Sequence, residues 1–356
     1  MALALSLGRR AQGKCWPNPA VGCVIVRDGR IVGRGHTRPG GRPHAERVAL
    51  DRAGSTARGA TAYVTLEPCA HHGQTPPCAK ALIEAGIARV VVPLQDSDPR
   101  VSGKGIAMLR SAGVEVTTGV LAAEARADLA GFFRKVEAGR PWVTLKLATS
   151  FDGRIATASG QSQWITGPEA RRAVHALRNR HDAVMVGAGT ARADDPMLTV
   201  RGFGEVRQPV RVVVSRRLDL PRESRLARTA RDVPVWICHG ADADQDRVRA
   251  WTDLGAVLLP CALQGGHICL GAVLDALGGQ GLTRVFCEGG GALAASLLAG
   301  GAVDELVVFT AGVGLGAEGL PSVGAMGISA LEEAERFQLA ACHRVGADVM
   351  HRWVKP

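Results

Sequence analysis

The stretch between residues 44 and 78 holds the residue types that a hydrolytic metal site needs. It reads HAE, then TLEPC and HHGQTPPC, and it offers one imidazole, His44, and two thiols, Cys69 and Cys78. Zinc at a hydrolytic site takes three protein ligands and keeps a fourth position for water. Glu46 is a carboxylate that can move protons between that water and a leaving group. The stretch therefore predicts a Zn²⁺ ion on His44, Cys69 and Cys78, with Glu46 as the catalytic residue.

Two other interpretations of these residues are open. A lone buried cysteine is most often a small core hydrophobe, and a purely structural zinc more often has four protein ligands. His71 or His72 offers a fourth ligand for a closed site of that kind. However, the order His-x-Glu, Pro-Cys and a second Cys is the signature of zinc deaminases, and a closed site leaves Glu46 without a purpose. The hydrolytic interpretation is therefore favoured.

Length and composition are those of a soluble globular protein with two or three domains. The chain has 356 residues, of which 46% are hydrophobic and 21% charged. No run of about 18 apolar residues is present, so no membrane span is expected. The start, MALALSLGRR, places charge after the apolar stretch, which is the wrong order for a signal peptide. Nine cysteines without paired spacing indicate a reducing compartment, so we expect a cytoplasmic protein.

The basic charge does not by itself indicate nucleic-acid binding. The net charge is +10, but the basic residues are mostly arginines spread along the chain, and only 4% of the residues are aromatic. Nucleic-acid binding is typical of clustered basic residues with aromatic side chains for base stacking. An anionic small substrate or cofactor is a sufficient explanation. We therefore expect a small-molecule partner, and neither nucleic acid nor a membrane.

The first 140 residues follow an alternating α/β pattern. Strands are predicted over 20–27, 30–35, 61–66, 88–94 and 114–118, with a hairpin turn at Asp28-Gly29. Helices are predicted at the N-terminus and over 44–53, 78–86, 105–112 and 121–138. Both halves of the metal site then lie at helix starts, where the helix N-terminus favours a thiolate. A domain boundary is expected at Gly139-Arg140-Pro141.

The second part of the chain has apolar strands that run into glycines. Strands are predicted from residue 142 and over 210–215, 233–239 and 304–311, the last of which is expected to close the pattern. The segments 181–190 and 284–293 are each predicted to begin as a strand and to run into glycines. Gly289 to Gly291 precede a helix over 292–300, and their exposed N–H groups suit an anion. The alternative is that these glycines only make tight turns. The segment from Gly187 to Thr190 repeats the pattern more weakly, and neither stretch is a dinucleotide fingerprint.

Two further groups of residues each have two interpretations. Trp164 lies among small polar residues, where it would stack on a nicotinamide or adenine, or pack at a domain seam. Asp194, Asp195 and Arg201 would hold ribose or phosphate, or the Asp-Asp-Pro sequence would form an ordinary turn.

Together these motifs resemble the bifunctional deaminase–reductase family of riboflavin biosynthesis. The resemblance rests on PNPAVGCVIV, HAE, TAYVTLEPCAHHGQTPPC, LKLATSFDGRIA, SGQSQWITG, DAVMVGAGTARADDPMLTVR, CEGGGAL and VDEL. Its most specific feature is the gap of eight residues, Ala70 to Pro77, between the two thiols. Cytidine and tRNA adenosine deaminases have two residues there.

The resemblance implies two enzymatic domains. Residues 1–140 would form a cytidine-deaminase-like α/β/α domain with a mixed sheet, and residues 141–356 a dihydrofolate-reductase-like α/β domain rather than a Rossmann fold. The first would deaminate 2,5-diamino-6-(5-phosphoribosylamino)pyrimidin-4(3H)-one with zinc on His44, Cys69 and Cys78. Glu46 would take a proton from the attacking water and pass it to the departing ammonia. The second would use NADPH to reduce the ribosyl chain of 5-amino-6-(5-phosphoribosylamino)uracil to ribityl.

The resemblance also implies the residues that bind each ligand. Those expected to contact NADPH are Ala148, Trp164, Thr190, Asp194, Gly290, Gly291, Ala292, Leu293, Ala294, Ala295 and Ser296. Those expected to contact substrate are Asn18, Ser162, Arg178, Leu198, Arg201 and Glu288. Arg178 and Arg201 suit a 5′-phosphate, because guanidinium groups match phosphate oxygens, and Lys146 and Asp152 would be polar members of the site. A homo-oligomer is expected, as is common for enzymes of this size.

The chain departs from the family pattern at two places. Ser215-Arg216 follows VRVVV where the family tends to have Asp-Ser, and Thr310-Ala311-Gly312 stands where the family runs into Ala-Pro. Independently of these departures, two other functions are kept as alternatives. One is a tRNA or nucleobase deaminase whose C-terminal half binds RNA. The other is a binding protein on a retired enzyme scaffold, against which the intact Glu46 counts.

Overall fold

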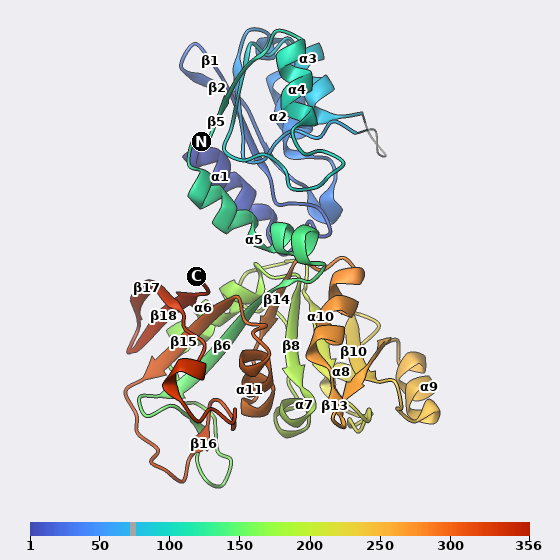
Figure 1. Ribbon diagram of the computed structural model, residues 1–356, viewed down its shortest axis with the longest axis vertical. Coiled ribbons are helices and arrows are strands. Elements are labelled where there is room, and N and C mark those ends of the chain that lie inside the picture. The colour runs from blue at the N-terminus through green and yellow to red at the C-terminus, as the bar shows by residue number, and fades with distance from the viewer. Residues whose placement is uncertain (72–75) are drawn as a thin grey trace. The chain divides into compact units, whose positions relative to one another are not determined.

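The chain folds into two compact units. The computed structural model describes residues 1–71 and 76–356. The N-terminal unit is Met1–Gly139, and the C-terminal unit is Arg140–Pro356 (Figure 1). His72, one of the two candidates for a fourth metal ligand, lies outside the described residues. In the part of the chain that is described, every helix is too short or too polar to cross a membrane.

The N-terminal unit is built on a five-stranded mixed sheet. In spatial order its strands are β2 (Arg30–His36), β1 (Gly22–Arg27), β3 (Thr61–Val64), β4 (Arg89–Val92) and β5 (Glu115–Thr118). β1 is antiparallel to β2 and β3, whereas β3, β4 and β5 are parallel. Asp28 and Gly29 adopt φ of 49° and 72° between β1 and β2. That left-handed backbone is what a two-residue hairpin turn requires.

Helices lie on both faces of this sheet. They are α1 (Ala2–Gly8), α2 (Ala45–Ala53), α3 (Cys78–Glu84), α4 (Lys104–Ser111) and α5 (Ala122–Ala138). α2 packs on the face that Cys23 and Ile25 of β1 form, and α1 packs on the opposite face, against Val24. Successive residues of a strand point to opposite faces, so β1 alone contributes to both layers of the core.

The C-terminal unit is built on a nine-stranded sheet. In spatial order its strands are β11 (Val257–Cys261), β10 (Val235–Gly240), β9 (Val210–Val214), β8 (Ala183–Gly187), β14 (Arg284–Cys287), β6 (Trp142–Ser150), β15 (Glu305–Ala311), β18 (Asp348–Val354) and β17 (Gln338–Val345). From β11 to β15 the neighbours are parallel, and β18 is antiparallel to both β15 and β17.

The remaining elements of this unit connect or cover these strands. The helices are α6 (Pro168–Arg178), α7 (Ala188–Asp194), α8 (Arg225–Arg228), α9 (Gln245–Asp253), α10 (Leu270–Gly279) and α11 (Gly291–Ala299). β12 (Leu263–Gln264) pairs with β13 (His267–Ile268), and β7 (Arg154–Ala156) pairs with β16 (Leu320–Pro321). The core lies where α6 to α9 meet the sheet, around Trp251, Phe286 and Phe309.

The predicted α/β class is confirmed, but three local predictions are wrong. Residues 304–311 do not close the sheet, because β18 and β17 follow at its edge. Most residues of β17 are exposed and most of β18 are half-buried, so neither has the buried apolar run of the predicted strands. The segment 188–194 forms the helix α7, for which no helix was predicted. His44 is the N-cap residue of α2, one position before the first turn.

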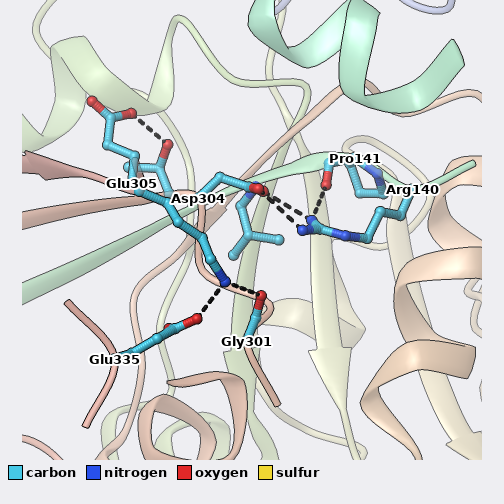
Figure 2. Close-up of polar contacts among 9 residues, drawn as sticks. Arg140, Pro141, Gly301, Asp304, Glu305 and Glu335 are labelled. Carbon is cyan, nitrogen blue, oxygen red and sulfur yellow. Dashed lines mark hydrogen bonds and ion pairs between the residues drawn. The ribbon is translucent and has the colours of Figure 1, made fainter. Parts of the chain in front are cut away.

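A buried ion pair fixes the first residues of the C-terminal unit. Arg140 donates from Nη1 and Nη2 to the carboxylate of Asp304 at 2.8 and 3.0 Å (Figure 2). Asp304 is fully buried and also accepts the N–H of Val143 at 2.8 Å. The next residue, Glu305, accepts the Thr144 hydroxyl at 2.9 Å. The acidic pair of the VDEL motif therefore anchors β6 to β15.

Candidate functional site

Three backbone segments bring His44, Cys69 and Cys78 together. His44 precedes α2, Cys78 is the first residue of α3, and Cys69 lies in the segment that leaves β3. The N–H of Cys78 donates to Cys69 Sγ at 3.3 Å, and the N–H of Ala79 donates to the Cys69 carbonyl at 3.2 Å. The start of α3 therefore holds Cys69 by both its side chain and its main chain.

The donor atoms of these residues converge on one point. They all lie within 4.8 Å of one another, and His44 Nδ1 lies 3.7 Å from Cys69 Sγ and 3.4 Å from Cys78 Sγ. Zinc bonds of about 2.0 Å to nitrogen and 2.3 Å to sulfur, at a tetrahedral angle, span about 3.6 Å. The cluster therefore fits zinc with one coordination position left for water. Among the described residues this is the group with metal-binding geometry; His71 is not a member, so a closed site completed by His71 is not supported.

Burial and mutual contacts set the protonation of the site. Glu46, in the first turn of α2, is 4% exposed, and burial raises its pKa to about 7. A hydrogen bond from the Cys78 thiol lowers the pKa of Cys69 to about 4, and the same contact raises the pKa of Cys78. The site thus offers a preformed thiolate, and Glu46 can accept and release a proton near neutral pH.

Asn18 lies in the loop between α1 and β1. Its N–H donates to the Cys15 carbonyl at 3.0 Å. A Cβ at Gly41 would lie 1.9 Å from Asn18 Nδ2, and Gly41 has a φ of 87°. Only glycine at position 41 therefore leaves room for the Asn18 side chain.

In the C-terminal unit, α7 and α11 begin at the carboxyl ends of the neighbouring strands β8 and β14. The N–H of Gly187 donates to the Gly289 carbonyl at 3.1 Å, and the N–H of Gly290 donates to Thr190 Oγ1 at 3.0 Å. Thr190 and Gly290, two of the predicted cofactor residues, are thus brought together. Gly290 is the N-cap of α11, and residues 291–296 form its first turns. Parallel α/β sheets bind ligands at this edge.

Part of the glycine triplet has a steric explanation. Gly289 has a φ of 85°, and a Cβ at Gly291 would lie 2.9 Å from the Pro321 carbonyl oxygen. The tight-turn interpretation therefore accounts for these two positions, and an anion cradle stays a prediction.

Arg178 and Glu288, both predicted to bind substrate, form an ion pair between the end of α6 and the end of β14. Arg178 Nε lies 2.5 Å from Glu288 Oε1, and Nη2 lies 2.9 Å from Oε2. Each side chain is 11% exposed. Arg178 also donates to the Thr199 carbonyl at 2.8 Å, and the N–H of Arg201 donates to His175 Nδ1 at 3.2 Å. The last turns of α6 therefore hold the segment that carries Arg201.

Lys146 of β6 belongs to the same charged cluster. Burial lowers the pKa of Lys146, and the charge of Glu288 opposes that shift. Burial would raise the pKa of Glu288, but Arg178 and Lys146 outweigh it and hold that pKa below its usual value. In this cluster the carboxylate of Glu288 therefore interacts with the basic side chains of both Arg178 and Lys146.

The other predicted residues are more scattered. Ala148 lies in β6 opposite Phe309 of β15, and Asp194 is the last residue of α7, where burial raises its pKa. Leu198 is buried with a φ of 53°, an uncommon backbone conformation for a branched side chain. Ser162 is half-buried in the loop that precedes α6.

Trp164 and Asp152 make contacts that the sequence did not predict. Trp164 is 67% exposed. The Arg171 guanidinium lies over the Trp164 ring, 4.7 Å from the ring centroid. Asp152 accepts the N–H groups of Leu315 and Gly316 at 3.1 and 2.7 Å, so it fixes the loop after β15.

The residues at the two departures from the family pattern make side-chain contacts within the C-terminal unit. Ser215 donates to Asp219 at 3.2 Å, and Arg216 pairs with Asp242 at 3.0 Å. Thr310 lies 3.2 Å from His351 Nε2.

Sequence reasoning missed two residues that organise these sites. His175 accepts the Arg201 N–H, as described above, and Glu67 accepts three backbone N–H groups beside the metal ligands. The only signal for Glu67 is a charged residue at the end of an apolar strand, directly before Pro68-Cys69.

Comparisons with known proteins assign each of the two units to a known protein domain. A model of the cytidine and deoxycytidylate deaminase zinc-binding region matches residues 1–94, and a model of the RibD C-terminal domain matches residues 141–351. The riboflavin biosynthesis protein RibD of Escherichia coli is 42% identical over 370 residues, which cover 98% of this chain and 96% of that protein. This chain belongs to the RibD family. The RibD protein of Aquifex aeolicus is 41% identical, with the same share of each chain covered.

Solved structures of the family agree with this assignment. RibD of Acinetobacter baumannii, form 1, has a TM-score of 0.89 and 38% identity, over 100% of this chain and 97% of that one. A diaminohydroxyphosphoribosylaminopyrimidine deaminase/5-amino-6-(5-phosphoribosylamino)uracil reductase of Thermotoga maritima has a TM-score of 0.87 and 34% identity, with the same coverage.

The family assignment decides between the interpretations of the sequence. The predicted fold class is confirmed, with a cytidine-deaminase-like unit followed by the family's reductase domain. The zinc-binding region spans His44, Cys69 and Cys78, which agrees with the donor geometry. The RibD C-terminal domain occupies the half that an RNA-binding module would need. The chain is therefore a bifunctional riboflavin biosynthesis enzyme of the RibD type.

Proposed function

We propose that the chain deaminates 2,5-diamino-6-(5-phosphoribosylamino)pyrimidin-4(3H)-one and then reduces 5-amino-6-(5-phosphoribosylamino)uracil with NADPH. The deamination step is supported by the convergence of His44 Nδ1 and two cysteine sulfurs near the buried Glu46. This site precedes a RibD C-terminal domain in the chain. The second step is supported by the membership of residues 141–351 in that domain and by the charged cluster around Glu288.

In the deaminase unit, His44, Cys69 and Cys78 would hold a zinc ion, and Glu46 would move the proton. A bound zinc would supply a Lewis acid that makes a water nucleophilic near neutral pH. Glu46 suits the proton transfer because burial raises its pKa to about 7, so it can take a proton from the attacking water and deliver it to the leaving amine. Asn18 would hold the pyrimidine, in the position that Gly41 leaves for its amide.

In the reductase unit, NADPH would lie across the carboxyl ends of β8 and β14. It would contact the predicted residues Ala148, Trp164, Thr190 and Asp194 together with the start of α11, residues 290–296. The Thr190–Gly290 hydrogen bond supports this proposal, because it fixes the start of α11 against α7. Helix N-termini favour phosphate groups.

The substrate of the reductase would lie over Ser162, Leu198 and the charged cluster. Arg178 uses three of its five N–H donors on Glu288 and Thr199. Arg201 projects from a segment that the end of α6 holds in place. Both arginines would thus be oriented toward the 5′-phosphate, which suits the fork geometry of a guanidinium group. Glu288 is held ionised, so its role is to orient Arg178 and Lys146.

The experiment that tests this function follows both products in one protein. Glu46→Gln keeps the size of the side chain but cannot accept a proton. We expect zinc to be retained and ammonia release from the diaminopyrimidine substrate to fall about 10²–10⁴-fold. NADPH oxidation with the uracil substrate should be unchanged, because the reductase has its own residues. Wild-type ammonia release by Glu46→Gln would remove Glu46 from the mechanism, and absence of both activities in the wild-type protein would refute the proposed function.

The proposal includes a cytoplasmic homo-oligomer that acts on small molecules. Analytical ultracentrifugation of the purified protein tests the oligomeric state, and fractionation of cells that express it tests its location.

A further inference from the structure

Glu67 is a buried carboxylate whose oxygens accept only main-chain donors among the contacts described. Its side chain is 4% exposed. Oε2 accepts the N–H groups of Asp96 at 3.1 Å and Gly103 at 2.9 Å, and Oε1 accepts the N–H of Ile106 at 3.0 Å. Hydrogen bonds with an ionised acceptor are roughly twice as strong as neutral ones, and a buried N–H left without an acceptor is costly. Glu67 therefore fixes the main chain on which these donors lie.

Two of these partners form the start of α4. Gly103 is the N-cap residue of α4 and Ile106 is its third residue, and the N-cap position has no side-chain hydrogen bond of its own. The first N–H groups of a helix need acceptors, and a negative charge there is favoured by the helix dipole. Glu67 therefore supplies, from the segment after β3, the contact that an N-cap Ser or Asp supplies within a helix.

The next two residues connect this contact to the metal site. A Cβ at Gly105 would lie 1.9 Å from the Pro68 carbonyl oxygen, so glycine is needed for Pro68 to lie against α4. Cys69 follows directly, and its sulfur and carbonyl accept the N–H groups of Cys78 and Ala79 at the start of α3. Cys69 is thus held between the N-termini of two helices, through Glu67 and Pro68 on one side and α3 on the other.

We propose that Glu67 is a positioning residue for the zinc site, which sets the place of Cys69 Sγ relative to His44 and Cys78. It touches neither metal nor substrate; it acts through residues 67–69 and their attachment to α4. The inference rests on the zinc site of the proposed function. Groups that orient metal ligands typically change metal affinity by 10–100-fold when they are removed.

The test measures metal binding without substrate. Metal-free protein is titrated with Co²⁺ in competition with a chelator, and the absorption bands of thiolate-bound cobalt are recorded. A glutamine has one oxygen in place of two, so in Glu67→Gln at least one of the three N–H groups loses its acceptor. We expect the affinity for Co²⁺ to fall about tenfold in Glu67→Gln and about 100-fold in Glu67→Ala, with shifted bands in both.

Asp182→Asn is the matched control. Asp182 is also buried, and it accepts the N–H groups of Thr283 and Arg284 at 2.6 and 2.9 Å, but it lies in the C-terminal unit. We expect it to lower the melting temperature and to leave cobalt affinity and absorption unchanged. Gly105→Ala tests the same attachment from the other side: a Cβ there displaces Pro68, and we expect the bands to shift as in Glu67→Gln.

Wild-type cobalt affinity and absorption in Glu67→Gln and Gly105→Ala would overturn the inference, whatever happens to the melting temperature. Glu67 would then only stabilise the fold. If Glu67→Ala does not fold, these two milder variants decide. A wild-type protein that binds no cobalt would instead refute the zinc site, and with it the proposed deaminase step.

Discussion

Replacing Glu288 with glutamine tests the charged cluster of the C-terminal unit. The substitution keeps the size of the side chain but removes the charge that Arg178 contacts at 2.5 and 2.9 Å. Both side chains are 11% exposed, so water cannot fully solvate the arginine that is left behind. Removing one partner of a buried ion pair costs about 3–5 kcal/mol. We expect the low end, about 3 kcal/mol, because Arg178 keeps its hydrogen bond to the Thr199 carbonyl.

Differential scanning calorimetry and two activity assays measure the consequence. For a domain of this size a loss of 1 kcal/mol lowers the melting temperature by about 2–4 °C, so the C-terminal unit should melt about 6–12 °C lower. NADPH oxidation should fall, because Arg178 and Lys146 lose the charge that orients them. Ammonia release should not change, because its residues lie in the other unit.

Glu335→Gln is the control for removing a charge from a weaker pair. Glu335 pairs with Lys355, and their side chains are 23% and 35% exposed. A more exposed pair contributes about 0–1 kcal/mol, so this variant should melt close to the wild type. The double variant Arg178→Gln/Glu288→Gln should be more stable than the sum of its single changes predicts. If the stability losses of the two single variants simply add in the double variant, the reasoning is refuted. It is also refuted if Glu288→Gln has the melting temperature and the NADPH oxidation of the wild type.

Two further predictions concern the C-terminal unit. Thr190→Val removes the oxygen that accepts the Gly290 N–H at 3.0 Å. Loss of this hydrogen bond costs about 1 kcal/mol, so we expect the KM for NADPH to rise about fivefold, with ammonia release as the unchanged control. Burial lowers the pKa of His181 to about 4, against about 6.5 in an unfolded chain. Between these two pH values the unfolded chain binds this proton and the folded chain does not. The free energy of unfolding should therefore fall by about 3 kcal/mol as pH drops from about 6.5 to about 4. Above about pH 6.5 this contribution should be constant. Urea denaturation across that range should show the fall in the wild type and a smaller one in His181→Gln; equal slopes would contradict the assignment.

The metal ligands could be predicted because their chemistry restricts them. An imidazole, two thiols and a carboxylate in the order of HAE and two Pro-Cys pairs have few other uses together. The fold brings the imidazole and the two thiols within 4.8 Å of one another. The hairpin of β1 and β2 could be predicted because Asp-Gly is a strong local turn signal. In both cases a short stretch of sequence carries the information.

What the sequence could not show depends on contacts between distant segments. Glu67 meets N–H groups of residues 96, 103 and 106, and no local pattern marks a side chain as an acceptor for them. β18 was missed because its Arg352 looks like a surface residue, whereas it pairs with the buried Glu305 of β15. The helix α7 was not predicted, because its seven residues, AGTARAD, are too few to show a helical apolar pattern.

Glu46 and Glu67 are two buried carboxylates near the metal ligands, and their contacts differ. Both lie within two residues of a metal ligand, and both are 4% exposed. The two oxygens of Glu67 accept three main-chain N–H groups, so this carboxylate holds the backbone around it. Glu46 has a pKa raised to about 7 by burial and lies among titratable side chains, so it can exchange a proton during a reaction. The partners of a buried carboxylate, main-chain donors or titratable groups, therefore indicate whether it holds the fold or takes part in chemistry. The two variants test this division: Glu46→Gln should keep its metal and lose ammonia release, whereas Glu67→Gln should bind metal more weakly.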